Sequence, residues 1–563
     1  MNIENLRHIT AEFVNEWARL LVPHFGSAGS MDLDLQFWED AEGPSYYNQF
    51  SHYTFLLLAS GRIPGCDQKA RDTYRELALR NIEYVLRITD ETGHTPHYSR
   101  GQNWGQHVGE WINYYLLCSL ELMDAYDWGG ADLRERVKEV LSQTTQILYE
   151  RYLKHFTQPP TGFLSNHATW HALLFYRAGR YFDKKDWTEY GQDFFSQRIL
   201  PFQNSDGYWP EGGGIVVNYS MVTDLAVSIY AELSNDERAH ASIGRSLGFH
   251  EYMSFPDGSS AVVVDTRMRR SSNPFMFLPP GFLNYECETF LENRLKMARD
   301  RLTKNKLPEN SAQAFAFFGP FANALFLEVL EDKQFANKAF DRPSSLPLAR
   351  IENNDWQVYL GRQVTPEHGG RFILDTQNFI EIWHHEAGYL AGTGGSKFMP
   401  LFSTLRRVNG GRSYIPDKIQ HVRSDETSAE VLFCFDQDEI LVRILIENEK
   451  CHIAAAVKKP VQENAYEFAL VLAVHVEEIL NFNQVEKRIN PVQLINETAR
   501  KAPLNTLIWR ELKWTLPEGA VCAYPLIPYN SYTQNGLPQP TEYTVRLSLK
   551  LTTEIQTLTI QPV

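Results

Sequence analysis

The sequence predicts an incomplete (α/α) toroid over residues 1–340, followed by an antiparallel β-sandwich over residues 341–563. Three observations predict this fold class. The chain has 563 residues, more than a single hydrophobic core usually supports. Its first part places apolar residues at helical spacing. Its last part contains short runs rich in β-branched and aromatic residues.

The helical part begins with one apolar stripe on residues 6–21. Similar periodic segments cover residues 66–88, 107–125, 131–155, 166–181, 215–233, 285–302 and 311–331. Loops rich in glycine, proline and aspartate separate them. No sequence repeat can be aligned between the segments. Helical hairpins arranged in a ring are therefore favoured over a superhelix of regular repeats.

The β part contains runs such as residues 356–360, 430–435 and 543–551, and the last of these alternates in polarity. Many such runs with few helical segments between them indicate a sandwich. The linker is expected over residues 338–350, which contain Pro343 and Pro347.

The composition restricts the classes of partner. The net charge is −15, from 54 basic and 69 acidic residues, which argues against nucleic acid as a partner. One cleft with a few cations can still bind an anionic sugar. Neither a signal peptide nor an 18-residue apolar run is found, which predicts a cytoplasmic protein without a membrane partner. A periplasmic or secreted location is expected instead if a leader has been removed. The oligomeric state stays open.

Two short stretches contain the strongest candidates for catalysis. Asn166 and His167 stand where a loop meets an apolar helix. Tyr219 follows a glycine-rich loop that contains Trp209 and Glu211. Taken singly, Asn166 could be an ordinary helix cap, His167 a first-turn residue and Tyr219 a packing residue.

Together, the two stretches resemble the heparinase II/III-like polysaccharide lyases and the related alginate lyases. In that superfamily an Asn-His pair begins one toroid helix, and the catalytic tyrosine follows an Asp-Gly…Glu-Gly loop. Here Tyr219 lies 53 residues after Asn166 (219 minus 166), and the loop has the Asp206-Gly207…Glu211-Gly212 form.

Two further segments are similar to the same family. One is 256–267, which ends in Arg267, and the other is Trp383-His384-His385-Glu386, followed by a Gly-rich Ser-Lys stretch at 392–397. The family pattern is His-x-His, with the first histidine catalytic and the second often a structural zinc ligand. Adjacent residues of a strand point to opposite faces, so only one of the two histidines can face a cleft. Motif order favours His384. The departure from the pattern does not support zinc, so no cofactor is expected.

The resemblance implies β-elimination on a glycan that contains uronic acid. Asn166 and His167 would donate hydrogen bonds to the uronate carboxylate, which stabilises the enolate-like intermediate. Tyr219 would act as general base, general acid or both, and His384 could be a second base or hold Tyr219. A phenol normally titrates near pH 10, so Tyr219 would need donors or positive charge nearby.

Candidate contacts to an anionic oligo- or polysaccharide combine aromatic, amide, imidazole and charged side chains. They are Trp104, Gln106, His107, Tyr47, Trp209, Glu211 and Arg267, the last beside Arg269 and Arg270. Aromatic faces suit the apolar faces of sugar rings, and guanidinium groups suit carboxylates. Each residue could equally be a packing or a solvated residue.

Two other functions compete. A glycoside hydrolase needs a pair of carboxylates, for which Asp206, Glu211 and Glu110 are candidates. A catalytically silent glycan-binding protein would keep the fold without turnover. A hydrolase product is heavier than a lyase product by one water, so mass spectrometry separates the two enzymes.

Overall fold

The structure is a computed structural model, and it divides into two compact units. It describes residues 3–30, 51–99, 102–104, 109–155, 165–267, 278–303 and 338–563, the last range without 354, 366–368, 371–374, 376, 393–396, 410–411, 461–463, 476, 489–499 and most of 527–541. The first unit comprises residues 1–258 and 274–344, and the second comprises 259–273 and 345–563.

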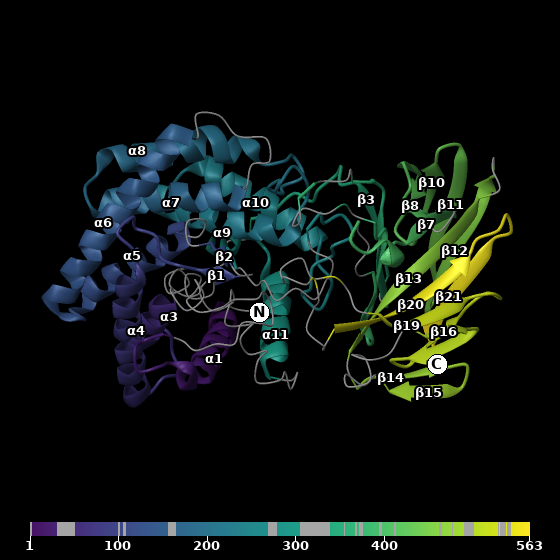
Figure 1. Ribbon diagram of the computed structural model, residues 1–563, viewed down its shortest axis with the longest axis horizontal. Helices are drawn as coiled ribbons and strands as arrows, with labels where there is room; N and C mark the ends of the chain where they lie inside the picture. Colours follow the sequence, from purple (N-terminus) through teal and green to yellow (C-terminus); the bar gives the residue numbers. More distant parts are fainter. Residues whose placement is uncertain are drawn as a thin grey trace. The chain divides into compact units, whose positions relative to one another are not determined.

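The first unit is helical and the second is built from antiparallel sheets, which confirms the predicted fold class (Figure 1). The division after Ser344 lies close to the predicted boundary at residue 340. Residues 259–273 belong to the sheet unit, although the sequence on both sides of them belongs to the helical unit. This was not predicted.

The described helices of the first unit are α1 (Ile3–Leu21), α3 (Ser51–Ser60), α4 (Gln68–Ile88), α5 (Gly109–Tyr126), α6 (Gly130–His155), α7 (Ser165–Tyr181), α8 (Lys185–Phe194), α9 (Val217–Ser234), α10 (Glu237–Tyr252) and α11 (Glu288–Thr303). A two-stranded hairpin, β1 (Tyr98–Ser99) and β2 (Gln102–Asn103), precedes α5. These bounds match seven of the predicted periodic segments, and the predicted helix at 311–331 lies outside the described residues.

Local chemistry explains several of the helix ends. Asp67 caps α4, where its carboxylate accepts the backbone N–H of Ala70, and Asp236 caps α10 by accepting the N–H of Arg238. Helix α9 ends at Asn235, which has a left-handed backbone with φ of 57°. Asparagine tolerates that conformation better than most residues.

Helices α5, α7 and α9 run parallel to one another. Tyr114 of α5 packs edge-on against Trp170 of α7, and further along the same two helices Glu121 pairs with Arg177. The indole N–H of Trp170 donates to the carbonyl of Val222 in α9. Helices α8 and α10 follow α7 and α9 after short connections and pack back against them. Hairpins of this kind form a toroid whose parallel helices all begin at one end.

A repeated turn occurs ahead of α3, α5 and α9 in the chain, although no sequence repeat is visible. It occurs at residues 26–30, 90–94 and 204–208. In each turn the amide of the first residue donates to the carbonyl of the fifth, and a glycine at the fourth position donates back to the first. These glycines are Gly29, Gly93 and Gly207, and all have positive φ. A β-carbon on Gly207 would lie 2.2 Å from the carbonyl oxygen of Arg245 in α10, so the turn rests directly on a helix backbone.

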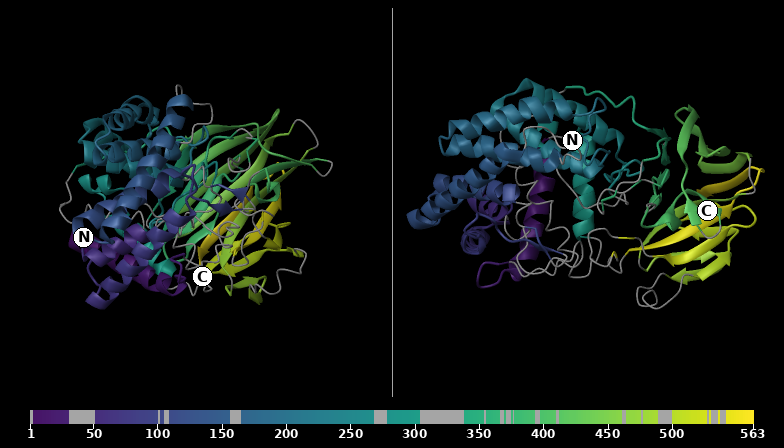
Figure 2. Two further views of the ribbon diagram at one scale, coloured as in Figure 1. Left: turned by 60° about the vertical axis from the view of Figure 1, so that its left-hand side comes forward. Right: turned by 45° about the horizontal axis from the view of Figure 1, so that its top comes forward.

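The second unit contains two antiparallel sheets, of nine and ten strands among its described residues (Figures 1 and 2). The first sheet contains β9 (Lys418–Ser424), β10 (Ser428–Phe435), β11 (Asp438–Glu447), β12 (Lys450–Lys459), β14 (Ile479–Phe482), β15 (Val485–Arg488), β17 (Thr506–Trp509), β18 (Leu512–Thr515) and β21 (Gln556–Pro562). The second contains β3 (Leu348–Glu352), β4 (Trp356–Gly361), β5 (Ile380–His384), β6 (Gly388–Ala391), β7 (Leu405–Asn409), β8 (Arg412–Tyr414), β13 (Ala465–His475), β16 (Arg500–Pro503), β19 (Val521–Leu526) and β20 (Glu542–Lys550).

One hydrophobic core lies between the two sheets, and both contribute to it. On β5, Ile380 and Ile382 belong to this core, so Glu381 between them points to the other face. There the Glu381 carboxylate accepts the backbone N–H groups of Val262 and Val263, each at 2.7 Å. The segment that crosses from the helical unit is therefore fixed to the sheet by one buried carboxylate.

Candidate active site

The strongest cluster of polar side chains lies where α5, α7 and α9 begin. Glu110 belongs to the first turn of α5, Asn166 and His167 to that of α7, and Tyr219 to that of α9. Glu211 precedes α9 in the glycine-rich loop. Because the three helices are parallel, their first turns lie at one end of the toroid, where the N–H groups of a helix start also favour anions.

Glu110 holds His167. The Glu110 side chain is 0% exposed, and one of its carboxylate oxygens, Oε1, accepts a short hydrogen bond from Nδ1 of His167. The His167 side chain is 27% exposed. Trp111 packs against the imidazole with ring centroids 4.7 Å apart. A reachable imidazole is thus backed by a carboxylate that solvent cannot reach.

A second imidazole lies on the other side of the same carboxylate. Nε2 of His171 is 3.6 Å from Oε2 of Glu110, and the hydroxyl of Tyr152 is 2.7 Å from Nδ1 of His171. Burial disfavours ionisation of Glu110, but His171 and His167 outweigh it and hold the pKa of the carboxyl below its usual value. Burial lowers the pKa of His171 in spite of the neighbouring carboxylate. Glu110 is therefore a buried negative charge between two imidazoles.

Asn166 also has a buried carboxylate as its hydrogen-bond partner. Its side-chain amide donates to Oε1 of Glu211 at 2.7 Å, and both residues are 0% exposed. Glu211 is anchored in turn by paired backbone hydrogen bonds with Gly214. The loop ahead of α9 is thus tied to the first turn of α7.

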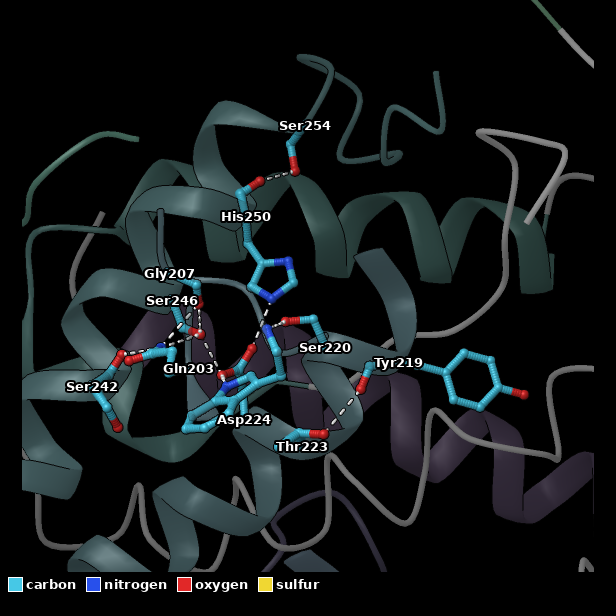
Figure 3. Close-up of polar contacts among 11 residues, drawn as sticks. Gln203, Gly207, Tyr219, Ser220, Thr223, Asp224, Ser242, Ser246, His250 and Ser254 are labelled. Atoms are coloured by element: carbon cyan, nitrogen blue, oxygen red, sulfur yellow. Dashed lines mark hydrogen bonds and ion pairs between the residues drawn. The ribbon is translucent and has the colours of Figure 1, made fainter. Parts of the chain in front are cut away.

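The same loop is fixed from the opposite side by Asp224 of α9 (Figure 3). The Asp224 carboxylate accepts hydrogen bonds from Nε1 of Trp209 at 2.5 Å, from the hydroxyl of Ser246 and from Nε2 of His250 at 2.7 Å. Burial lowers the pKa of His250, against the effect of Asp224. Because all four residues are buried, this cluster holds the loop and helices α9 and α10 together.

Tyr219 lies just outside this cluster. Its backbone carbonyl accepts a hydrogen bond from the hydroxyl of Thr223, and the hydroxyl of the next residue, Ser220, accepts the backbone N–H of Trp209. The phenol ring is half-buried and extends away from the Asp224 cluster (Figure 3). The backbone of Tyr219 is therefore well fixed, while its side chain remains partly accessible.

The structure corrects two predicted substrate contacts. Trp209 is 0% exposed and donates to Asp224, so the prediction that it stacks on a sugar is wrong. Glu211 is equally buried and holds Asn166, which makes it a positioning residue rather than a contact. Trp104 is half-buried at the base of the β1–β2 hairpin, and its role stays a prediction. Tyr47, Gln106 and His107 lie outside the described residues, as do Arg269 and Arg270.

The carboxylates proposed for a glycoside hydrolase all have structural roles. Glu110 and Glu211 are fully buried behind His167 and Asn166. Asp206 is buried as well, and its carboxylate accepts the backbone N–H of Ser344 at 3.0 Å. A hydrolase needs carboxyl groups that reach the glycosidic bond. The geometry therefore disfavours the hydrolase hypothesis.

The two sandwich histidines face opposite sides, and the choice between them needs correction. His384 is buried on the core side of β5, where its ring packs edge-on against Trp356 and Nδ1 accepts the backbone N–H groups of Glu386 and Ala387. Burial lowers the pKa of His384. His385 is exposed and lies after the end of the strand. Motif order favoured His384, but the accessible ring is that of His385.

Arg267 also belongs to the second unit, and its backbone N–H donates to the carboxylate of Asp265 at 2.7 Å. Its proposed contact with a substrate carboxylate stays a prediction. Among the described residues, no group of three or more His, Cys, Asp or Glu side chains is placed to hold a metal ion. In the same part of the chain, none of the helices is long and apolar enough to cross a membrane.

No protein-family model matches the chain, and no curated protein is similar to it in sequence. Solved structures do match. Chondroitin AC lyase of Streptomyces coelicolor A3, in complex with chondroitin sulphate, is 11% identical with a TM-score of 0.48, over 99% of this chain and 79% of that chain. Heparan sulfate lyase HepC of Pedobacter heparinus is 9% identical with a TM-score of 0.40, over 98% and 82%.

A mutant of the unsaturated glucuronyl hydrolase of Streptococcus agalactiae is 10% identical with a TM-score of 0.38, over 58% of this chain and 90% of that chain. The chain is similar in fold to these proteins, with a TM-score below 0.5 in each case. Similarity at this level shows the fold and not the activity.

Proposed function

We propose that this protein is a lyase that cleaves uronic-acid-containing oligo- or polysaccharides by β-elimination. One observation carries the proposal. Two buried carboxylates, Glu110 and Glu211, hold His167 and Asn166 at the start of α7, beside helix α9, whose first turn contains Tyr219. This arrangement fixes donors for a carboxylate next to a phenol that can move a proton.

The difficult step in such a reaction is the loss of the proton at C5 of the uronate. The adjacent carboxylate is already negative and resists further charge. Donors on that carboxylate stabilise the enolate-like intermediate, as an oxyanion hole does. We assign this role to Asn166 and to His167, whose ring is partly exposed and, as an imidazolium, donates from Nε2 while Nδ1 donates to Glu110. Because Asn166 is fully buried, its contact with substrate requires that binding uncovers the amide.

Tyr219 is the proposed proton carrier. As phenolate it takes the C5 proton, and the electrons of the C5–H bond form the C4=C5 double bond while the C4–O4 bond breaks. The leaving oxygen at C4 then takes the proton from the phenol, which restores the phenolate. No water is consumed, so one product carries a new unsaturated ring. The mechanism does not require His384, in keeping with the burial of that ring.

The proposal is tested by incubating the purified full chain with alginate, glucuronan, heparinoid and chondroitin-type polymers. We expect at least one polymer to yield a product that absorbs in the ultraviolet through its C4=C5 double bond. Mass spectrometry should show this product lighter by one water than a hydrolysis product. We expect Tyr219→Phe to lower kcat by about 1,000-fold or more, since the proton carrier is lost.

Tyr208→Phe is the matched control. It removes another half-buried phenol hydroxyl from the loop ahead of α9, where Tyr208 packs on Phe249. We expect this variant to retain the rate of the wild type. Saturated products would contradict the proposal, and so would equal rates for the wild type and Tyr219→Phe. Binding without turnover on every polymer would favour a silent glycan-binding protein.

A further inference from the structure

Glu110 stands out because its carboxylate is closed off between two imidazoles. It is 0% exposed, and its two oxygens face different histidines, His167 through Oε1 and His171 through Oε2. A buried carboxylate is costly unless it is paired and hydrogen-bonded. Both partners are imidazoles from α7, one of them at the proposed site, so the cost of burying Glu110 is coupled to the state of His167.

The contact determines which nitrogen of His167 carries a proton. A carboxylate only accepts hydrogen bonds, so Nδ1 of His167 must be the donor to Glu110. The geometry of the ring then directs Nε2 away from Glu110. Trp111 packs against the ring face at 4.7 Å and restrains its rotation. The orientation of His167 is therefore set by two residues of α5.

His171 and Tyr152 close off the other side of Glu110. Nδ1 of His171 lies 2.7 Å from the Tyr152 hydroxyl and 2.9 Å from the backbone carbonyl oxygen of His167, and Nε2 lies 3.6 Å from Oε2 of Glu110. The rings of Tyr152 and His171 also pack together, with centroids 4.1 Å apart. Glu110 is thus enclosed by side chains of α6 and α7, and His167 is the imidazole to which it is hydrogen-bonded.

We infer that Glu110 is a positioning residue that keeps a proton on Nδ1 of His167 and fixes the orientation of the ring, so that Nε2–H of the imidazolium is directed away from Glu110 and can donate to the substrate carboxylate. This inference rests on the proposed function and adds a group that never touches substrate. Glu110 was a candidate carboxylate for a glycoside hydrolase, and the positioning role takes the place of that one.

The direct test is the ¹⁵N NMR spectrum of the full chain labelled with ¹⁵N-histidine. The signals of His167 are assigned by their loss in the variant His167→Gln. We expect Nδ1 of His167 to be protonated in the wild type. In Glu110→Gln the amide can either accept from or donate to Nδ1, so we expect the fixed protonation of Nδ1 to be lost. These spectra do not depend on any activity.

The kinetic test uses the same variant. We expect Glu110→Gln to lower kcat by about 100-fold or more with KM changed less than about threefold, because the ring is misprotonated while the cleft keeps its shape. Glu121→Gln is the matched control. It removes a carboxylate from the same helix, where Glu121 pairs with Arg177, and we expect it to leave kcat unchanged.

The outcomes separate the two proposals. An Nε2-protonated neutral His167 in the wild type would overturn the inference, as would unchanged protonation of Nδ1 and an unchanged kcat in Glu110→Gln. If Glu110→Gln fails to fold, the wild-type spectrum alone still decides. If the wild type forms no unsaturated product on any polymer, the proposed function fails, while the nitrogen spectra still report on Glu110.

Discussion

At the scale of single residues, Asn166 depends on Glu211 for its orientation. Both side chains are fully buried, and the amide-to-carboxylate bond of 2.7 Å joins two separate elements. We expect Glu211→Ala to lower the free energy of unfolding by about 1–3 kcal/mol, because a buried amide loses its acceptor. We expect kcat to fall as well, since Asn166 is no longer held. Chemical denaturation and initial rates measure the two effects.

Glu211→Gln separates the hydrogen bond from the charge. The glutamine oxygen can accept the same N–H from Asn166, so we expect this variant to recover most of the stability and part of kcat. If Glu211→Ala lost stability but kept full kcat, the idea that Glu211 positions Asn166 for catalysis would be wrong, and its role would be structural only.

The residues proposed to touch a reacting group stand in motifs that the sequence shows, whereas the residues behind them do not. Asn166, His167 and Tyr219 stand in short motifs with characteristic spacing. Glu110 and Glu211 were visible only as acids, because burial depends on contacts between helices far apart in sequence. Likewise, the pair His384 and His385 shows that one side chain must face the core, but only the strand register with Trp356 decides which.

At the scale of elements, seven of the described α-helices were predicted from the sequence, whereas α3, α8 and α10 were not. Helix α3 (Ser51–Ser60) is buried along most of its length, so its sequence carries no polar face to mark a helical period. The repeated turn escaped detection for a different reason. Its members share backbone hydrogen bonds and one glycine, which leave almost no trace in the sequence.

The turn at Gly207 gives a prediction for this scale. Its φ is +94°, and a β-carbon would lie 2.2 Å from the Arg245 carbonyl oxygen, so either the turn or α10 must move. We expect Gly207→Ala to lower the free energy of unfolding by about 3 kcal/mol or more, since strain and overlap add. Urea denaturation of the full chain measures the loss.

Gly213→Ala in the same loop is the matched control. Gly213 also has positive φ, at +87°, but a β-carbon there would meet nothing within 4 Å. We expect a loss of only about 1–2 kcal/mol from backbone strain. Equal losses in the two variants would show that the contact between the turn and α10 contributes nothing to stability.

At the scale of the whole molecule, each of the two compact units is made of two separate stretches of the chain. The composition and the change of periodicity near residue 340 were enough to predict two units. They could not show that residues 259–273 belong to the sheet unit, because Val262 and Val263 are held there by a side chain more than 100 residues later in the chain, Glu381. A segment bound in this way links the stability of the sheet unit to the ionisation of a single group.

That link predicts a specific dependence on pH. Burial raises the pKa of Glu381 to about 8, in spite of the hydrogen bonds that it accepts from Val262, Tyr389 and Val263. The ordinary value for glutamate in an unfolded chain is about 4.3. Between these values the folded chain keeps a proton that the unfolded chain releases. The contribution of Glu381 to the free energy of unfolding is therefore fully present below about pH 4.3. It is lost as the pH rises through about 8.

Glu381→Gln keeps the shape of the side chain and cannot ionise. Its oxygen can accept the N–H groups of Val262 and Val263, so we expect it to fold like the wild type at pH 4.5. As the pH rises to 8, only the wild type loses the stability that protonated Glu381 contributes. The free energy of unfolding of the variant should then exceed that of the wild type by on the order of 1–4 kcal/mol. Calorimetry of both chains between pH 4.5 and 8.5 measures this divergence.

The control Glu486→Gln removes an exposed carboxyl from β15 and should follow the wild type at every pH. Parallel curves for Glu381→Gln and the wild type would mean that Glu381 does not hold its proton in the folded chain.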